Sequence, residues 1–463
     1  MSESVQRASE DAAFGLDHEF VQAIVDALAA GDGARIVALV KPLHHSDLAD
    51  LVQSLPAEGR RVLIDLLGAD FPSEVLSELD ETVLDEIVDC LGIDKLAEAV
   101  SDLDSDDAVE VVQELDVDEQ REVLDAISAG DRTFIEEGLT FPEDSAGRLM
   151  QRELVSVPEF WTVGETIDFL RHTADEDEDS LPDVFYDIFV VDPAHHPIGA
   201  VSLSQFLRNK RPVRVADIMT TELHAIPVTM DQEEIAFLFR QRDLVSSPVV
   251  DADGRLVGAI TVDDVVDVID EEHEEDIMRL GGVQEGDLYS AITETTRLRF
   301  MWLLLNLATA IIASMVIGLF EATIQQMVAL AVLMPIVASM GGNAGTQTMT
   351  VAVRALSTRE LGPTNALRVI GKEVLVGGFN GVLFALITGI VAWGWFDSPA
   401  VGVVIGLAMV INMVVAGLAG TTIPLILERV GIDPAVGSSV FLTTVTDVVG
   451  FLSFLGLAAW LLF

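Results

Sequence analysis

Cysteine and positive charge are both scarce in this sequence of 463 residues. The single cysteine, Cys90, excludes an intrachain disulfide and suits a reducing compartment. Only 26 lysines and arginines stand against 76 aspartates and glutamates, which gives a formal charge of −50. Nucleic acid is therefore excluded as a ligand, because its binding needs basic patches, and docking on anionic lipid is disfavoured. Divalent cations are the natural counter-ions of such a chain.

A signal-peptide pattern is also absent, because the first residues, MSESVQRASEDAAF, show no basic stretch followed by an apolar run. The negative charge is confined to one part of the chain. Residues 1–289 hold 68 acidic and 19 basic side chains, whereas residues 290–463 hold 8 and 7. Since mean hydropathy is nevertheless +0.43, we predict an acidic cytosolic half followed by a nearly neutral membrane half.

Five apolar stretches are long enough to cross about 30 Å of hydrocarbon. They lie near residues 300–320, 326–353, 368–396, 400–427 and 434–462. Basic side chains occur before the first span and around the second and fourth connections, and the first and third connections have none. The positive-inside rule then places the N-terminus in the cytoplasm and the C-terminus outside. The sequence predicts a multi-pass protein of the plasma (inner) membrane.

Asp447 is an isolated acid in the last span, within TTVTDVVGFLSF. At 1.5 Å per residue it lies about 24 Å from Phe463 along a helix, deep in the bilayer. Acids at that depth usually face a protein interior or a water-filled path, and no span carries a central Lys or Arg to pair with this one. Two interpretations remain: a protonated Asp447 bonded to a neighbouring helix, or a carboxylate neutralised by a mobile cation.

The second span contains the unusual sequence LMPIVASMGGNAGTQT, residues 333–348. Proline and glycine break the helical hydrogen-bond ladder and free carbonyls, which membranes tolerate where protein or water satisfies them. Broken helices with exposed carbonyls commonly line ion paths, whereas glycine clusters also permit tight helix packing. The polar residues between the glycines favour a wet lining.

The residue types around such a path indicate which cation it would carry. A carboxylate with carbonyls and amides is a hard-oxygen environment, and the absence of Cys and His from the spans disfavours zinc and copper. Mg²⁺ dehydrates reluctantly and is often held by one or two carboxylates while it keeps its waters. A single Asp, doubled if two chains meet, therefore suits hydrated Mg²⁺ better than Ca²⁺.

The acidic half shows two kinds of pattern. Residues 18–130 read as successive short amphipathic helices, which predicts a stacked helical superhelix. Two copies of a strand–turn–strand–helix unit follow, YDIFVVDPAHHPIGAVSLSQFL and LVSSPVVDADGRLVGAITVDDVVDVI, and they predict paired small α/β modules. The second copy continues into VDDVVDVIDEEHEED, residues 262–276, with nine acids and no basic residue. This run is either a solvated helix face or, because it adjoins the membrane half, a regulatory element.

Taken together, these residues resemble the MgtE family of magnesium channels over nearly the whole chain. The resemblance rests on GGNAGTQ in the second span, GIDPAV before the last span and TTVTDVVGF within it. It rests also on the order of a helical domain, tandem cystathionine β-synthase (CBS) modules, an acidic helix and five spans.

The implied fold is a multidomain membrane protein with an all-α helical-repeat N-domain, tandem α/β CBS modules, an acidic plug helix and a five-helix transmembrane domain. The expected segments are a disordered N-terminus (1–17), the N-domain (18–149), CBS module 1 (150–212), CBS module 2 (213–264), the plug and connecting helix (265–296) and the pore domain (297–463).

The resemblance further implies a homodimer in membrane lipid, with the pore on the two-fold axis. Asp447 matches the family's pore aspartate, and the residues that match its pore-lining segment are Gly341, Gly342 and Asn343. The residues that match its acidic Mg²⁺-sensing positions are Asp106, Glu110, Asp231, Asp243, Asp264, Glu272, Glu275 and Asp276. Mg²⁺ is thus expected both as the transported ion and as the regulatory ion.

CBS modules often bind adenine nucleotides through a G-x-x-[ST]-x-x-[DN] pattern. The second module keeps it as Gly258, Thr261 and Asp264. In the first module Gln205 takes the place of the acid, so the departure argues against ATP there.

The predicted function is a Mg²⁺-selective channel for uptake, closed by cytoplasmic Mg²⁺ bound between acidic faces. The alternative is a proton- or Na⁺-coupled transporter of divalent cations that uses Asp447 as its coupling acid. An enzyme is not expected, because no P-loop, zinc-ligand cluster or activated nucleophile stands out.

Overall fold

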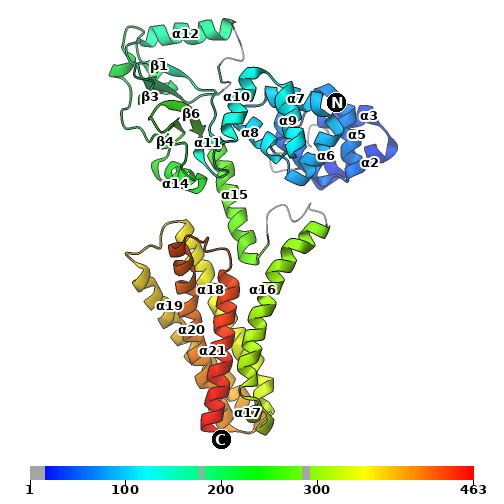
Figure 1. Ribbon diagram of the computed structural model, residues 1–463, viewed down its shortest axis with the longest axis vertical. Helices are drawn as coiled ribbons and strands as arrows, with labels where there is room; N and C mark the ends of the chain where they lie inside the picture. The colour runs from blue at the N-terminus through cyan, green and yellow to red at the C-terminus, as the bar shows by residue number, and fades with distance from the viewer. Residues whose placement is uncertain (1–15, 177–180, 183, 284–291) are drawn as a thin grey trace. The chain divides into compact units, whose positions relative to one another are not determined.

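The computed structural model describes residues 16–176, 181–182, 184–283 and 292–463 (Figure 1). Two compact units divide the chain, one ending at Glu272 and the other beginning at His273. Almost all of the predicted disordered N-terminus, residues 1–15, lies outside the described residues, as does part of the expected connection to the first span, residues 284–291.

Short helices make up the first part of the N-terminal unit, as the periodicity predicts. They are α2 (His18–Ala30), α3 (Gly33–Val40), α4 (His45–Ser54), α5 (Ala57–Leu67), η1 (Gly68–Asp70), η2 (Ser73–Val75), α6 (Glu81–Leu91), α7 (Ile93–Asp102), α8 (Ser105–Glu114), α9 (Val117–Ala126) and α10 (Ala129–Gly138). Side chains of Asp17, Asp32, Asp80 and Ser128 accept backbone N–H groups at helix starts, which satisfies donors that a helix leaves open.

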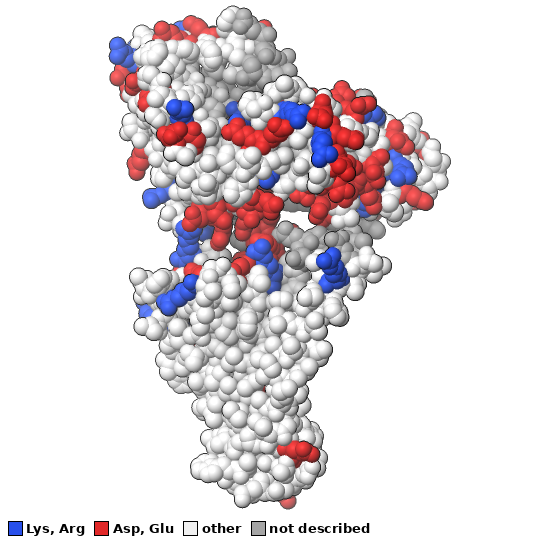
Figure 2. All heavy atoms as spheres, viewed as in Figure 1, with Lys and Arg blue, Asp and Glu red and all other residues white. Residues whose placement is uncertain are grey.

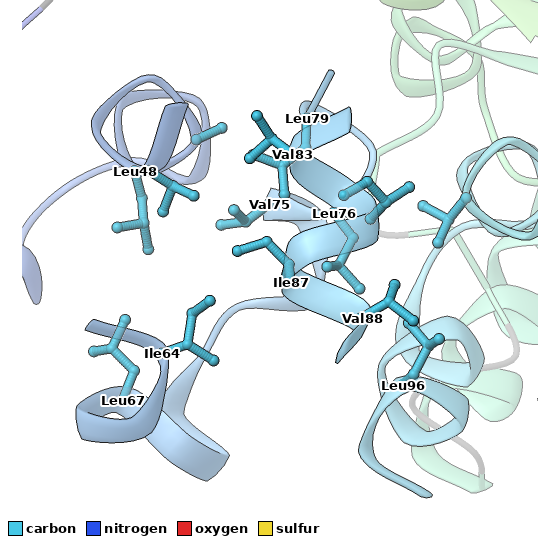
Figure 3. Close-up of a cluster of buried hydrophobic side chains, with 14 of the residues drawn as sticks. Leu48, Ile64, Leu67, Val75, Leu76, Leu79, Val83, Ile87, Val88 and Leu96 are labelled. Carbon is cyan, nitrogen blue, oxygen red and sulfur yellow. The ribbon is translucent and has the colours of Figure 1, made fainter. Parts of the chain in front are cut away.

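One apolar core joins these helices. Figure 3 shows its centre, where residues of α4, α5, η2, α6 and α7 converge, among them Leu48, Ile64, Val75 and Ile87. Each helix buries one stripe against its neighbours, so the stack is stable only as a whole.

Two small sheets with the same topology form the rest of the N-terminal unit. In each, the first strand runs parallel to the second and the second antiparallel to the third. The first sheet and its helices form one module, with β1 (Ser156–Pro158), α12 (Val163–Glu176), β2 (Asp187–Val191), β3 (Pro197–Ser202) and α13 (Leu203–Arg208). After η4 (Val215–Asp217), the second contains β4 (Ile226–Pro227), α14 (Gln232–Arg242), β5 (Ser246–Val250), β6 (Leu256–Thr261) and α15 (Val262–Gly281). The predicted duplication is therefore present.

A short segment before the first sheet belongs to the core of the second one. Helix α11 (Ala146–Leu149) and Met150 pack with Ile226, Ile235 and Ile260. The backbone of Ala146 donates to Met230, and Gln151 and Ala259 exchange two hydrogen bonds. The two modules are thus tied together through the chain that enters them.

In its described residues, the C-terminal unit has five helices that are long and apolar enough to cross a membrane. They are α16 (Ile292–Gly318), α18 (Ala329–Ser357), α19 (Ala366–Phe396), α20 (Pro399–Val430) and α21 (Ser438–Leu461), with the short α17 (Glu321–Gln326) before α18. Helix α20 packs against α18, α19 and α21. On the face shown in Figure 2 the long middle of this bundle carries no charge, whereas acidic side chains crowd the N-terminal unit.

The expected break in the second span does not occur. Helix α18 continues through Pro335 and all three glycines, and none of these glycines has a positive φ. Pro335 removes a single hydrogen bond, and glycine adopts helical geometry where neighbouring helices fill the space beside it.

Candidate functional site

Asp447 lies in the middle of α21 and is half-buried within the single chain. Among the residues that the structure describes, it has no hydrogen-bond or ion-pair partner. The side chain is left with surface through which a cation, water or a second chain could reach it.

The predicted pore-lining residues of α18 have unlike surroundings. Gly341 is buried, and a Cβ there would collide with the side-chain amide of Asn412. A Cβ at Gly342 would meet nothing within 4 Å. Asn343 is exposed, and its Nδ2 donates to Ser339 Oγ at 3.4 Å. Gly341 thus serves close helix packing, whereas Gly342 and Asn343 present backbone and amide to open space.

Two acidic helix faces lie close together in the N-terminal unit. Helix α8 contributes three carboxyls, and the first half of α15 contributes three more whose charges act on them. They are Asp106, Asp107, Glu110, Asp264, Asp267 and Glu271. Three of them, Asp107, Asp267 and Glu271, are absent from the sequence-based prediction. Their spacing on one face of each helix would have indicated them.

Burial and mutual repulsion perturb these groups strongly. Burial raises the pKa of Asp106 well above its usual range, and the charges of Asp264 and Asp107 raise it further. Burial likewise raises the pKa of Asp264 to about 7 and that of Asp107 to about 6. Desolvation, with Asp107 and Glu271 nearby, also raises the pKa of Glu110. The cluster therefore holds excess negative charge that a proton or a cation would neutralise.

Hydrogen bonds hold the α15 side of this cluster in place, whereas one carboxyl oxygen on the α8 side has no hydrogen bond among the described residues. Thr261 Oγ1 donates to Asp264 Oδ2 at 2.8 Å, and Gln151 Nε2 donates to Asp264 Oδ1 at 3.3 Å. In contrast, Oδ1 of Asp106 is buried with no hydrogen-bond partner in the described part of the chain. A buried acceptor without a partner is unfavourable, so this oxygen adds to the electrostatic cost of the cluster.

The other predicted sensor residues of this unit do not join the cluster. Asp231 caps the start of α14 by accepting the backbone N–H of Glu233 at 3.0 Å. Asp243 ends the same helix in the left-handed region, with φ 52°. They are therefore about 18 Å apart along the helix axis. Glu272 accepts from Gln232 Nε2 at 3.0 Å.

In the C-terminal unit, the last turns of α15 are tied to the ends of the membrane helices. Arg279 pairs with Glu275 one turn earlier, and its Nη1 lies 2.5 Å from Oδ2 of Asp433, between α20 and α21. Asp276 is hydrogen-bonded to Ser357 at the end of α18. Burial raises the pKa of Asp276, and the Asp433 charge adds to the effect. The predicted residues Glu275 and Asp276 therefore belong to one ionic cluster with Arg279 and Asp433, which sequence reasoning missed.

Apolar contacts strengthen the same junction. Leu280 packs against a cluster from three membrane helices and the α20–α21 turn, formed by Met349, Val353, Ala419, Ala435 and Leu442. A Cβ at Gly282 would collide with the indole of Trp302 on α16. The end of α15 is thus seated on the bundle and is not a freely solvated acidic helix.

The oxygen atoms of the candidate pore and sensor residues fit a hydrated divalent cation better than a fully coordinated one. Within the described residues, no three His, Cys, Asp or Glu side chains converge closely enough to hold a metal ion directly. The oxygens present are carboxylates and amides, which suit Mg²⁺ with its waters retained. Five helices that could span a membrane, with a carboxylate in the last one that has no partner among the described residues, agree with a cation-transporting membrane protein.

Comparison with known proteins identifies the family. A family model described as divalent cation transporter matches residues 334–457, the MgtE intracellular N domain matches residues 43–144, and the CBS domain matches residues 215–271. The magnesium transporter MgtE of Thermus thermophilus is 35% identical over 454 residues, covering 96% of this chain and 99% of its own. The magnesium transporter MgtE of Enterococcus faecalis is 34% identical and covers 70% of this chain and 71% of its own.

Among solved structures, the cytosolic domain of the Mg²⁺ channel MgtE in complex with ATP is 34% identical, with a TM-score of 0.49. It covers 54% of this chain and 99% of that structure. The chain belongs to the MgtE family of magnesium transporters. The family consists of transporters, not enzymes, as the sequence predicted.

Proposed function

We propose that this protein is a Mg²⁺ channel that mediates uptake across the plasma membrane as a homodimer. Magnesium transport follows from the family to which the chain belongs. The single observation that supports Asp447 as the pore residue is its carboxylate in the middle of α21, which has no partner in the part of the chain that the structure describes. In a dimer with the pore on the two-fold axis, two copies of this acid would hold a hydrated Mg²⁺ between them.

The proposed orientation follows from the ends of the helices. The basic residues flank the start of α16, the end of α18, the start of α19 and the end of α20, which are all the same end of the bundle. These residues are Arg297, Arg299, Arg354, Arg359, Arg368, Lys372 and Arg429. That end is cytoplasmic by the positive-inside rule, and the C-terminus is outside.

Closure by cytoplasmic Mg²⁺ is the proposed regulation. Two like charges about 4 Å apart at an effective dielectric near 20 repel by roughly 4 kcal/mol, so the facing acids of α8 and α15 disfavour a compact arrangement. Mg²⁺ between them reverses the sign. If the compact arrangement is the closed one, the ion shifts the equilibrium by its differential affinity for that state. The seating of α15 on α18 and the α20–α21 turn supports its role as the moving element.

The remaining predicted sensor residues and the nucleotide question fit this proposal in different ways. Asp231, Asp243 and Glu272 are solvent-accessible or bonded within their own module, so we assign them to contacts that a Mg²⁺-bound dimer would make. ATP is not assigned to this chain. Asp264, the acid of the second-module pattern, is bonded to Thr261 and Gln151 and belongs to the acidic cluster.

The deciding experiment is Mg²⁺ influx into liposomes containing the purified full-length protein. We expect Asp447→Asn to abolish influx, because the amide keeps the shape and removes the charge. Asp397→Asn is the matched control, since Asp397 ends α19 outside the spans and its change should leave influx unaltered. Intact influx in Asp447→Asn would refute the pore assignment.

The same liposomes separate a channel from a coupled transporter. A channel gives flux that follows the imposed voltage and persists without a proton or Na⁺ gradient. Flux that requires either gradient would favour the alternative in which Asp447 is a coupling acid.

A further inference from the structure

Asn412 is a fully buried polar residue in the middle of the apolar helix α20. Its Nδ2 donates to the carbonyl oxygen of Val337 on α18 at 2.8 Å. Its Oδ1 is buried and, within the described residues, has no hydrogen-bond partner. A residue whose only task was to fill this space would be apolar, because an unpaired buried amide oxygen is unfavourable.

The amide occupies space that only glycines leave open, and it does so against two helices at once. A Cβ added at Gly341 of α18 would collide with the amide, and a Cβ added at Gly450 of α21 would lie 2.8 Å from Nδ2. Gly450 is three residues beyond Asp447, about 4.5 Å along the helix. Gly341 directly precedes Gly342 and Asn343. One side chain of α20 therefore touches both helices that carry the candidate pore residues.

We infer that Asn412 is a positioning residue for ion selection. Its amide holds α18 against α21 and so sets the width of the passage beside Asp447, which decides how well hydrated Mg²⁺ is preferred over Ca²⁺. The inference rests on the proposed function of Asp447 as the pore carboxylate. Interhelical hydrogen bonds in membranes are modest, so the expected effect is on discrimination and not on the existence of the fold.

The test replaces Asn412 with leucine, which has the same number and branching of side-chain heavy atoms and no polar ones. Full-length protein in liposomes is assayed for Mg²⁺ and Ca²⁺ influx, and its thermal unfolding midpoint is measured. We expect the Mg²⁺-to-Ca²⁺ influx ratio to fall about threefold, with a midpoint equal to or above that of the wild type because the unpaired oxygen is gone. Met413→Leu is the matched control, since Met413 is buried one residue away and lies against Gly377 and Gly381 of α19.

A second variant reaches the same contact from the other helix. Gly450→Ala pushes the amide away from α21 and should lower the same ratio, so it decides the matter if Asn412→Leu does not fold. Gly456→Ala on α21 is its control, because a Cβ there would meet only Phe320, at 3.9 Å. A structural role alone would lower stability and leave the ratio unchanged.

Asp447→Asn in the same assay separates the two possible failures. If Asp447→Asn abolishes influx while Asn412→Leu and Gly450→Ala keep the wild-type ratio, the inference about Asn412 is wrong and the pore assignment stands. If Asp447→Asn conducts Mg²⁺ normally, the pore assignment is wrong and the inference fails with it.

Discussion

Replacing Asp264 by asparagine tests whether repulsion among the carboxylates of α8 and α15 destabilises the folded protein. The change is nearly isosteric, and an amide oxygen can still accept from Thr261 Oγ1, which now donates at 2.8 Å. The helix start is therefore preserved while one carboxylate is removed. In the absence of Mg²⁺ we expect the variant to be more stable than the wild type at pH 8.

The magnitude follows from the pKa of Asp264, which burial raises from 3.8 to about 7. At 1.36 kcal/mol per pKa unit this corresponds to about 4 kcal/mol for keeping the group ionised in the folded state. Because the carboxyl is partly accessible, we take about half of that value. The free energy of unfolding of Asp264→Asn should then exceed that of the wild type by about 2 kcal/mol, which raises Tm by about 4–8 °C for a unit of this size.

The pH dependence has a definite sign. Because the folded-state pKa is raised, the favourable contribution of protonated Asp264 is complete below 3.8 and is lost as the pH rises toward about 7. The advantage of Asp264→Asn should thus be largest above pH 7 and shrink steadily toward pH 5.

Thermal unfolding of the full-length protein with a chelator, from pH 5 to 8, measures this advantage. Asp270→Asn is the matched control, because Asp270 is an exposed acid on the same helix. Added Mg²⁺ should raise the Tm of the wild type more than that of Asp264→Asn. An equal advantage at pH 5 and pH 8, or a variant less stable than the wild type at pH 8, would show that repulsion is not what strains this cluster.

Two further predictions concern the C-terminal unit. Arg279→Met removes the pairs with Glu275 and Asp433. In patch recordings it should raise the Mg²⁺ concentration needed for closure up to about fivefold, the size expected for loss of a partly exposed ion pair. An unchanged closing concentration would exclude Arg279 from gating. Gly417→Ala places a Cβ 2.6 Å from the backbone oxygen of Glu373, which cannot move aside as a side chain could, and should destabilise the protein by about 1–3 kcal/mol in thermal unfolding. Gly394→Ala, with nothing within 4 Å of its Cβ, should have no such effect.

The sequence predicts well the features that depend on residues close together in the chain. Hydropathy finds all five spans, because each must present an apolar surface to lipid along its whole length. The helix ends differ by several residues, as where α18 continues to Ser357 beyond the predicted Val353, since capping and not lipid decides where a helix stops. The paired modules are predictable because their duplication is visible in the chain itself.

The features that it predicts poorly depend on partners distant in sequence. Nothing near Asn412 in the chain indicates that its amide reaches Val337, 75 residues away. For the same reason the glycines of α18 suggest a broken helix, whereas Asn412 and Leu442 fill the space beside Gly341 and Gly345 and keep the helix intact. A glycine pattern predicts that another helix packs closely, but it does not identify the residue that fills the space.

Helix α15 shows why the acidic run is more than a solvated face. Its first half carries Asp264, Asp267 and Glu271, whose charges act on the acids of α8, and its last turns carry Asp276 and Arg279, which bond to the ends of α18 and to the α20–α21 turn. The helix is continuous between these groups. Under the proposed regulation, a cation bound at its first half would therefore act on a helix whose last turns are bonded to the ends of the spans. A solvated face would need neither the buried carboxyl of Asp106 opposite it nor a salt bridge to Asp433 at its end.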